Sequence, residues 1–287
     1  MLRVVRRKLR TAMDYYSEGG LALVLRVIYR KIISIQPDPV FSGWGMTTTT
    51  FTPWHKGGGD DVARDFLKAH ADTVGKVARG EFNLSQFQRS PSLERQLGEL
   101  MWRHYIVFWS ARYAATATKC PVKNLVECGV CDGLSMHFAM NALKMRQVEF
   151  KSFLYDAWEA MRSEYLLASE KWCLGHYAYL SIESTKRNLT AFDKECNFIK
   201  GFIPDSFAGA SNRDEVDWLH IDLNSSLPTA RALEFFFDRI PAGGLVLLDD
   251  YAWQSFYDTK LAVDEFFAGK KGGLLHLPTG QAIFFKH

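Results

Sequence analysis

The segment from Asn124 to Ser135, with the sequence NLVECGVCDGLS, constrains the fold of this chain more than any other. An apolar run ends at Glu127, glycines follow at Gly129 and Gly133, and the next residues, MHFAMNALKM, have helical spacing. This order predicts a strand, a glycine turn and the start of a helix, where a ligand can lie against backbone amides. The glycine spacing is not G-x-G-x-x-G, so it departs from the dinucleotide-binding fingerprint.

Three further strand-like runs in the second half of the chain each end on acidic residues. SFLYD ends at Asp156, WLHID at Asp222, and LVLLDD at Asp249 and Asp250. Apolar runs that alternate with helical patterns predict an α/β fold, a mostly parallel doubly wound sheet with helices on both faces. Because ligands bind beyond the carboxyl ends of such strands, we expect these acidic residues to gather at one edge. The alternative for any one of them is a helix cap or a solvated strand end.

Length and composition agree with one such domain and an extension. The chain has 287 residues, and we expect residues 91–287 to form the α/β domain and residues 1–90 to form a helical and loop extension. A net charge of +3 gives no indication of nucleic-acid binding. The five cysteines form no paired framework of a secreted protein, which predicts free thiols and a cytoplasmic location.

The N-terminal region is basic and partly amphipathic. MLRVVRRKLRTAM lacks the apolar core and cleavage site of a signal peptide, and residues 21–35 have helical spacing but are too short to span a bilayer. Such a helix can make peripheral contact with an anionic membrane. The alternative, which we favour, is that it packs on its own domain or on a second subunit.

A loop and two helices are expected between this region and the first strand. Residues 36–61 hold three prolines, a run of three glycines and several aromatic residues, which suit a lid over a ligand or a connector. A helix is predicted from Asp60 to about Val77, and another from Ser90 to about Thr118.

Cys128 and Cys131 form a C-x-x-C between the predicted strand and helix, where a thioredoxin-like redox pair would lie. A thioredoxin-like domain is small, however, and would leave most of this chain without a role. The redox interpretation is therefore the less favoured one. No second C-x-x-C or histidine pair accompanies it, which argues against structural zinc.

Several segments together resemble a known family. VECGVCDGLS is similar to the glycine motif of class I S-adenosylmethionine-dependent methyltransferases, and the chain is identified as a member of the macrocin O-methyltransferase (TylF-type) family. The resemblance covers about residues 93–266 and continues through LYDAWEAM, FIKGFIPDSF, HIDLNSSLPTARALEFFFDRIPAGGLVLLDDY and AVDEF. It implies a Rossmann-like methyltransferase fold. Members of the family methylate sugar hydroxyls in antibiotics and surface glycans.

The resemblance also implies a cofactor site. The turn after the first strand would hold the methionine end of S-adenosylmethionine, and the acid that ends the second strand, Asp156, would accept hydrogen bonds from the ribose hydroxyls. Trp158 would flank the adenosine, with a buried packing role as the alternative. The residues implied at the methionine end are Glu127, Gly129, Gly133 and Ser135.

Asp222, Asp249 and Asp250 match the family's divalent metal ligands. Carboxylates are hard oxygen ligands that suit Mg²⁺ or Mn²⁺, and a metal that holds the acceptor would lower the pKa of its hydroxyl. The alternative for Asp249 and Asp250 is a pair of loop caps.

One position departs from the family pattern. Many relatives carry an acidic residue, thought to be the general base, where this chain has Asn224, and an amide cannot accept a proton at neutral pH. His220 has a suitable pKa for a base. A buried, hydrogen-bonded histidine is nevertheless the favoured interpretation of His220.

The expected function is therefore methyl transfer from S-adenosylmethionine to a hydroxyl of a small-molecule or glycan acceptor, that of a sugar in a glycan or natural product, with the assistance of Mg²⁺. By resemblance, and from the apolar helix at residues 21–35, a homo-oligomer is expected. The alternative from another class is a non-catalytic protein that binds S-adenosylmethionine, for which Asn224 is the main argument.

Overall fold

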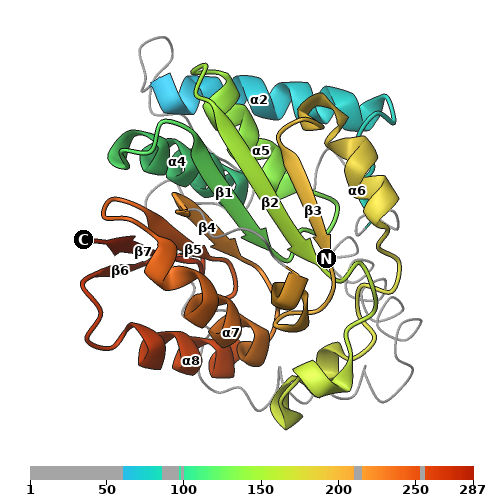
Figure 1. The fold of residues 1–287 in the computed structure, drawn as a ribbon. Helices are drawn as coiled ribbons and strands as arrows, with labels where there is room; N and C mark the ends of the chain where they lie inside the picture. The colour runs from blue at the N-terminus through green and yellow to red at the C-terminus, as the bar shows by residue number, and fades with distance from the viewer. Residues whose placement is uncertain (1–60, 86–96, 98–99, 210–214, 253–255) are drawn as a thin grey trace, which may run out of the picture. The chain divides into compact units, whose positions relative to one another are not determined.

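A mostly parallel sheet forms the centre of this protein (Figure 1). The structure is a computed structural model that describes residues 61–85, 97, 100–209, 215–252 and 256–287. Within these residues, seven strands pair in the order β3-β2-β1-β4-β5-β7-β6. Strands β1 to β5 run parallel, and β7 is antiparallel to both β5 and β6. The strands are β1 (Lys123–Cys128), β2 (Phe150–Asp156), β3 (Cys196–Lys200), β4 (Trp218–Ile221), β5 (Leu245–Leu248), β6 (Gly272–His276) and β7 (Ala282–Lys286).

Helices cover both faces of the sheet. In Figure 1, α2, α4 and α5 lie over one face and α7 and α8 over the other. The α-helices are α2 (Asp61–Ala78), α4 (Met101–Ala117), α5 (Leu134–Lys144), α6 (Ile182–Asn188), α7 (Ser226–Phe236) and α8 (Tyr257–Phe267). Short 3₁₀ helices are η2 (Ser163–Tyr165), η3 (Ala168–Cys173), η4 (Thr190–Phe192), η5 (Asp205–Gly209) and η6 (Phe237–Arg239). The architecture confirms the predicted Rossmann-like fold.

The central strands are rich in apolar residues because both of their faces are buried. All residues of β1, β4 and β5 are buried. Successive side chains of a strand point to opposite faces, so Leu125 and Trp218 pack under α4 and α5, while Val126 and Leu219 pack against α7. The alternation therefore builds two hydrophobic cores, one on each side of the sheet.

The first core includes the helix that precedes the sheet in sequence. Phe66 of α2 is fully buried and contacts the rings of Phe108 in α4 and Phe138 in α5. The helix predicted from Asp60 to Val77 is thus present as α2, and the one predicted to end near Thr118 is α4. Their predicted neighbours, the helix at residues 21–35, the loop at 36–61 and the helix start at Ser90, lie wholly or almost wholly outside the described residues. Among the described helices, none has the length and apolar character needed to cross a membrane.

The glycine turn lies where it was predicted, between β1 and α5. Gly129 has φ +87°, and its N–H donates to the carbonyl of Tyr155 at the end of β2, at 2.8 Å. A Cβ at this position would lie 1.9 Å from the backbone oxygen of Asp222. The absence of a side chain at Gly129 therefore lets the end of β1 and the residue after β4 approach closely.

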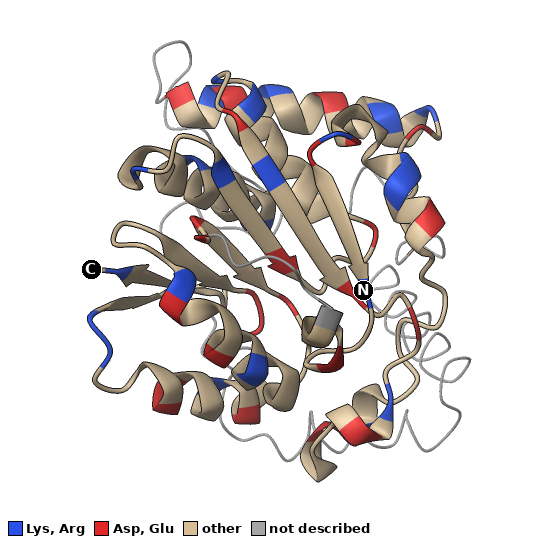
Figure 2. Ribbon diagram, viewed as in Figure 1, with Lys and Arg blue, Asp and Glu red and all other residues tan. Residues whose placement is uncertain are grey.

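The acidic residues lie at the same edge of the sheet because their strands are parallel. Glu127 is in register with His220, and Asp156 ends β2. Asp222 follows β4 directly, and Asp249 and Asp250 follow β5. Figure 2 shows acidic positions at the tips of β1 and β2.

Candidate active site

A cavity of about 340 Å³ opens at the carboxyl ends of β1, β2, β4 and β5. Its walls come from the turn after β1, the segment after β2, the start of α4 and the loops after β4 and β5. Of the predicted site residues, those in the lining are Gly129, Ser135, Asp156, Asp222, Asn224, Asp249 and Asp250. The others, Glu127, Gly133, Trp158 and His220, lie behind it. The sheet thus brings predicted cofactor-binding residues and the predicted metal ligands into one cavity.

Asp156 clamps the turn after β1. Its Oδ2 accepts the backbone N–H groups of Val130 and Cys131 at 2.7 and 2.8 Å, and its Oδ1 accepts that of Trp158 at 2.6 Å. Burial raises the pKa of this carboxyl, and the three amide donors oppose that rise. A carboxylate has about four acceptor positions, so one on Oδ1 remains for a ligand hydroxyl.

Glu127 and His220 form a buried pair on neighbouring strands. Glu127 Oε1 lies 2.8 Å from His220 Nδ1, and both side chains are almost fully buried. Burial disfavours a charge on His220, but the nearby carboxylates of Asp249, 3.9 Å from Nε2, and Glu127, hydrogen-bonded to Nδ1, outweigh burial and raise its pKa to about 9. His220 is therefore already protonated near neutral pH, which leaves it without the free lone pair that a general base needs. Glu127 Oε2 is buried without a partner among the described residues, which fits a donor such as an amine or a water.

Trp158 packs behind the turn rather than in the cavity. Its indole N–H donates to the carbonyl of Cys131 and to Thr185 Oγ1, at 3.2 and 3.0 Å. Its ring contacts Phe198 of β3. This is the packing role that stood as the alternative for Trp158. Gly133, with φ +84°, precedes the first residue of α5.

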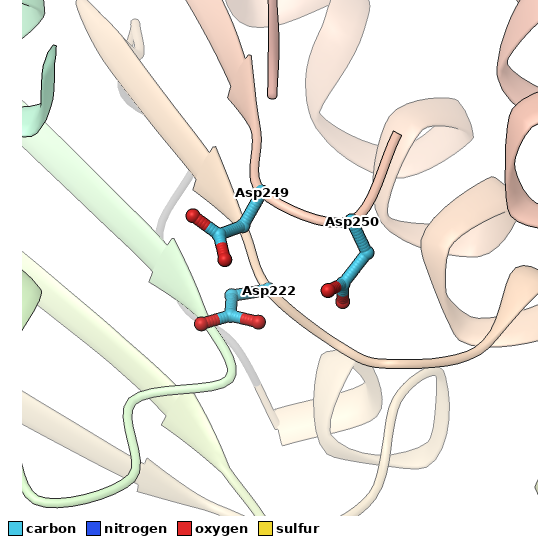
Figure 3. Close-up of side chains that lie close together, drawn as sticks. All are labelled: Asp222, Asp249 and Asp250. Carbon is cyan, nitrogen blue, oxygen red and sulfur yellow. The ribbon is translucent and has the colours of Figure 1, made fainter. Parts of the chain in front are cut away.

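Three carboxylates converge beyond β4 and β5. One oxygen from each of Asp222, Asp249 and Asp250 lies within 4.8 Å of the others (Figure 3). Burial and repulsion from Asp222 and Asp249 raise the pKa of Asp250 well above its usual range, and burial also raises that of Asp222. Buried acids this close are costly to ionise without a cation, so their arrangement fits a divalent ion with oxygen ligands.

Arg103 of α4 reaches this cluster, although it is not among the site residues predicted from the sequence. Its Nε donates to Asp249 Oδ1 at 2.9 Å, and its Nη2 donates to Asp222 Oδ2. Burial favours the neutral acid at Asp249, but Arg103 and His220 outweigh burial and lower its pKa. The available signal was a charged residue in the otherwise apolar and aromatic run MWRHYIVFW.

Asn224 joins the cluster through hydrogen bonds of both the nitrogen and the oxygen of its side-chain amide. Its Nδ2 donates to Asp222 Oδ1 at 3.2 Å, and its Oδ1 accepts the hydroxyl of Tyr177 at 3.1 Å. Its backbone N–H donates to Asp250 Oδ2 at 2.9 Å. Asn224 and Tyr177 have φ of +56° and +66°, which is rare for residues other than glycine and often marks a functional site. The amide therefore organises the carboxylates.

The C-x-x-C thiols lack the properties of a redox pair. Burial raises the pKa of Cys128 and of Cys131 well above the ordinary value, with nearby carboxylates adding to the rise. Redox-active thiols require the opposite shift. We expect Cys131→Ser to leave cofactor affinity unchanged in calorimetry, with Cys196→Ser as the control. A complete loss of methyl transfer in a folded Cys131→Ser protein would instead revive the redox interpretation.

The comparisons with known proteins identify the family. The family model for macrocin O-methyltransferase (TylF) matches residues 114–272, which include the turn, most of the cavity lining and the three aspartates. The chain belongs to the macrocin O-methyltransferase family. It is thus an S-adenosylmethionine-dependent O-methyltransferase, as the sequence motifs predicted. A search of curated proteins finds no match.

Solved structures share the fold. The O-methyltransferase NovP has a TM-score of 0.63 and 19% identity, and the match covers 79% of this chain and 99% of NovP. CalS11, a calicheamicin methyltransferase, has a TM-score of 0.54 and 11% identity, and the match covers 80% of this chain and 98% of CalS11. Both likenesses confirm the methyltransferase architecture.

Proposed function

We propose that this enzyme methylates a sugar hydroxyl, in a glycan or a natural product, with the aid of Mg²⁺ or Mn²⁺ held by Asp222, Asp249 and Asp250. One observation carries the proposal. Gly129 of the turn after β1 packs against the backbone of Asp222, so the predicted cofactor turn and the carboxylate cluster are adjacent in one cavity. Methyl transfer needs a donor carbon and an acceptor oxygen side by side, and this arrangement supplies both places.

One set of residues would bind the cofactor, and another would hold the ion and the acceptor. S-adenosylmethionine supplies a methyl group on a positively charged sulfur, and a divalent ion, when bound, supplies a Lewis acid that lowers the pKa of a hydroxyl. Asp156 would orient the ribose through the free acceptor position on Oδ1, and the buried Oε2 of Glu127 would accept an amine directly or through a water. The three aspartates would hold the ion at the acceptor side of the cavity. Asn224 keeps Asp222 and Asp250 in place through its amide and its backbone N–H.

The walls of the cavity support a sugar-like acceptor. Trp102, Tyr177 and Phe256 line it, and Tyr177 donates its hydroxyl to Asn224 beside the carboxylate cluster. Aromatic faces together with polar groups suit a ring that has both apolar and hydroxyl surfaces. The name of CalS11 also refers to a natural product, calicheamicin. Both observations favour a sugar or a natural product as the class of acceptor.

The N-terminal extension, residues 1–90, is proposed to help shape the site. Ser85 donates its backbone N–H to Asp132 Oδ2 at 2.7 Å, and Asp132 lies in the turn that lines the cavity. Asn188 of α6 links the two segments further, because its Nδ2 donates to the carbonyls of Asn83 and Asp132, each at 2.8 Å. Movement of the extension would therefore reach the turn. The expected lid, homo-oligomer and peripheral membrane contact remain predictions.

Loss of the Asp156 carboxylate is expected to weaken cofactor binding by at least about tenfold, since hydrogen bonds to a charged group contribute roughly 1.5–3 kcal/mol each. Isothermal titration with S-adenosylhomocysteine would compare the wild type with Asp156→Ala. The same titration with a 2′-deoxyribose analogue separates contact with ribose from a loosened turn. If Asp156 binds the hydroxyl, the wild type should lose affinity for the analogue and Asp156→Ala should lose little more. An equal loss for both ligands in the variant would assign Asp156 to the turn alone.

A further inference from the structure

We propose that Arg103 is a positioning residue for the metal ligands, holding Asp222 and Asp249 so that one oxygen of each is turned toward the ion. This role rests on the proposed metal site. Arg103 lies in α4, more than a hundred residues before either aspartate in sequence, and joins carboxylates from two different loops.

The hydrogen bonds of the cluster are distributed unevenly over the oxygens of the three carboxylates. Asp249 Oδ1 accepts from Arg103 and also from Gln281 Nε2 at 2.8 Å, and Gln281 is fully buried. Asp222 Oδ2 accepts from Arg103, and Asp250 Oδ2 accepts the N–H of Asn224. Among the described residues, Asp249 Oδ2 and Asp250 Oδ1 have no such donor, and the amide of Asn224 lies 3.2 Å from Asp222 Oδ1. Asp249 and Asp250 are thus each held through one oxygen, and Asp222 is held by Arg103 through Oδ2 and by the longer bond from Asn224 through Oδ1. The oxygens not bound by Arg103 face the other carboxylates and are left to coordinate an ion.

The guanidinium of an arginine is suited to orient two carboxylates at once. Its planar guanidinium presents Nε and Nη2 in a fixed fork, so the two bonds set the separation and the orientation of two carboxylates together. The side chain is 16% exposed, and it projects from a helix that packs in the core through Val107, Phe108, Ala111 and Ala114. Its position is therefore held by the fold. A lysine here would keep the charge but would present a single point instead of a fork.

The charge of Arg103 also matches the site to a divalent ion. Three ionised aspartates would carry three negative charges, and the guanidinium leaves a net charge of −2 for the cluster. A divalent cation would then neutralise the cluster of Arg103 and the three aspartates. Arg103 prevents the acids from repelling one another before the ion binds.

Isothermal titration with MnCl₂ tests the inference on the full chain in the absence of acceptor. Arg103→Met and Arg103→Lys are expected to bind Mn²⁺ about 10- to 100-fold more weakly than the wild type, the usual effect of removing an outer partner of metal ligands. The Mn²⁺ electron paramagnetic resonance spectrum should broaden in both variants, because the ligand geometry changes. Arg112→Met is the matched control, since Arg112 is also a buried arginine of α4 but pairs with Asp65, outside the cavity lining. It should bind Mn²⁺ as the wild type does.

The outcomes are distinct. A wild type that binds no Mn²⁺ overturns the proposed metal site and this inference with it. A wild type that binds, together with an Arg103→Met variant that binds equally well or more tightly, overturns the positioning role alone and makes Arg103 a competitor of the ion. Full recovery of affinity in Arg103→Lys would show that charge, and not the fork, is what the site needs. The lysine variant preserves the charge balance, so it tests the inference even if Arg103→Met fails to fold.

Discussion

Chelation of divalent cations is expected to lower the rate of methyl transfer by about 100-fold or more and to leave S-adenosylmethionine binding intact. A metal contributes several kcal/mol of charge stabilisation at the acceptor oxygen, and each 1.36 kcal/mol is a factor of ten in rate. The cofactor residues, by contrast, lie on the β1 and β2 side of the cavity. Release of S-adenosylhomocysteine would be measured on a panel of sugar acceptors in EDTA and after addition of Mg²⁺ or Mn²⁺, with calorimetry for the cofactor.

Asp250→Asn gives the same test within the protein. Asp250 is the best choice of the three aspartates because Arg103 pairs with Asp222 and Asp249, so this change leaves both ion pairs in place. The variant keeps an oxygen for the N–H of Asn224 but loses a charge. The control is Asp238→Asn, an exposed carboxylate of η6. Full activity of Asp250→Asn in EDTA would leave a transferase that needs no metal.

The sequence predicted the parts of the site that follow from the sheet itself. Asp156, Asp222, Asp249 and Asp250 each come directly at the end of an apolar run, and parallel strands bring such ends to one edge. The glycine turn was equally visible, because Gly129 and Gly133 interrupt a strand-to-helix transition and both have positive φ. These features depend on local sequence and on one topological rule.

The contacts that the sequence could not predict join elements distant in the chain. Arg103 meets the aspartates only because α4 lies against the sheet beside β4 and β5. The pairing of Glu127 with His220 depends on the register between β1 and β4, which no local pattern determines.

The surroundings of Asn224 also could not be predicted from the sequence. Its sequence position suggests that Asn224→Asp would restore a base, but its amide lies 3.2 Å from Asp222 Oδ1. A carboxylate there would repel Asp222 unless a cation separates them.

Gly129→Ala is expected to destabilise the protein by roughly 2–5 kcal/mol and to disrupt both the cofactor turn and the carboxylate cluster. A residue other than glycine at φ +87° costs about 1–2 kcal/mol, and overpacking in a close contact adds about 1–3 kcal/mol. The added Cβ would meet the backbone oxygen of Asp222 at 1.9 Å, and neither segment is free to yield. Gly129 donates to Tyr155 at 2.8 Å, and Asp222 donates its N–H to the carbonyl of Cys128 at 2.8 Å.

Thermal melts, together with titrations with S-adenosylhomocysteine and Mn²⁺, would separate the effect of backbone strain at positive φ from that of the steric clash with Asp222. For a domain of this size, the change should lower the Tm by roughly 10 °C. It should also weaken the binding of both S-adenosylhomocysteine and Mn²⁺, because the added Cβ pushes the turn and Asp222 away from each other. Gly269→Ala is the matched control, since Gly269 has φ +74° but has open space where the Cβ would lie. It should lower the Tm by only a few degrees through backbone strain and leave both affinities unchanged. Equal losses in the two variants would mean that the contact between Gly129 and Asp222 does not hold the cofactor turn and the carboxylate cluster together.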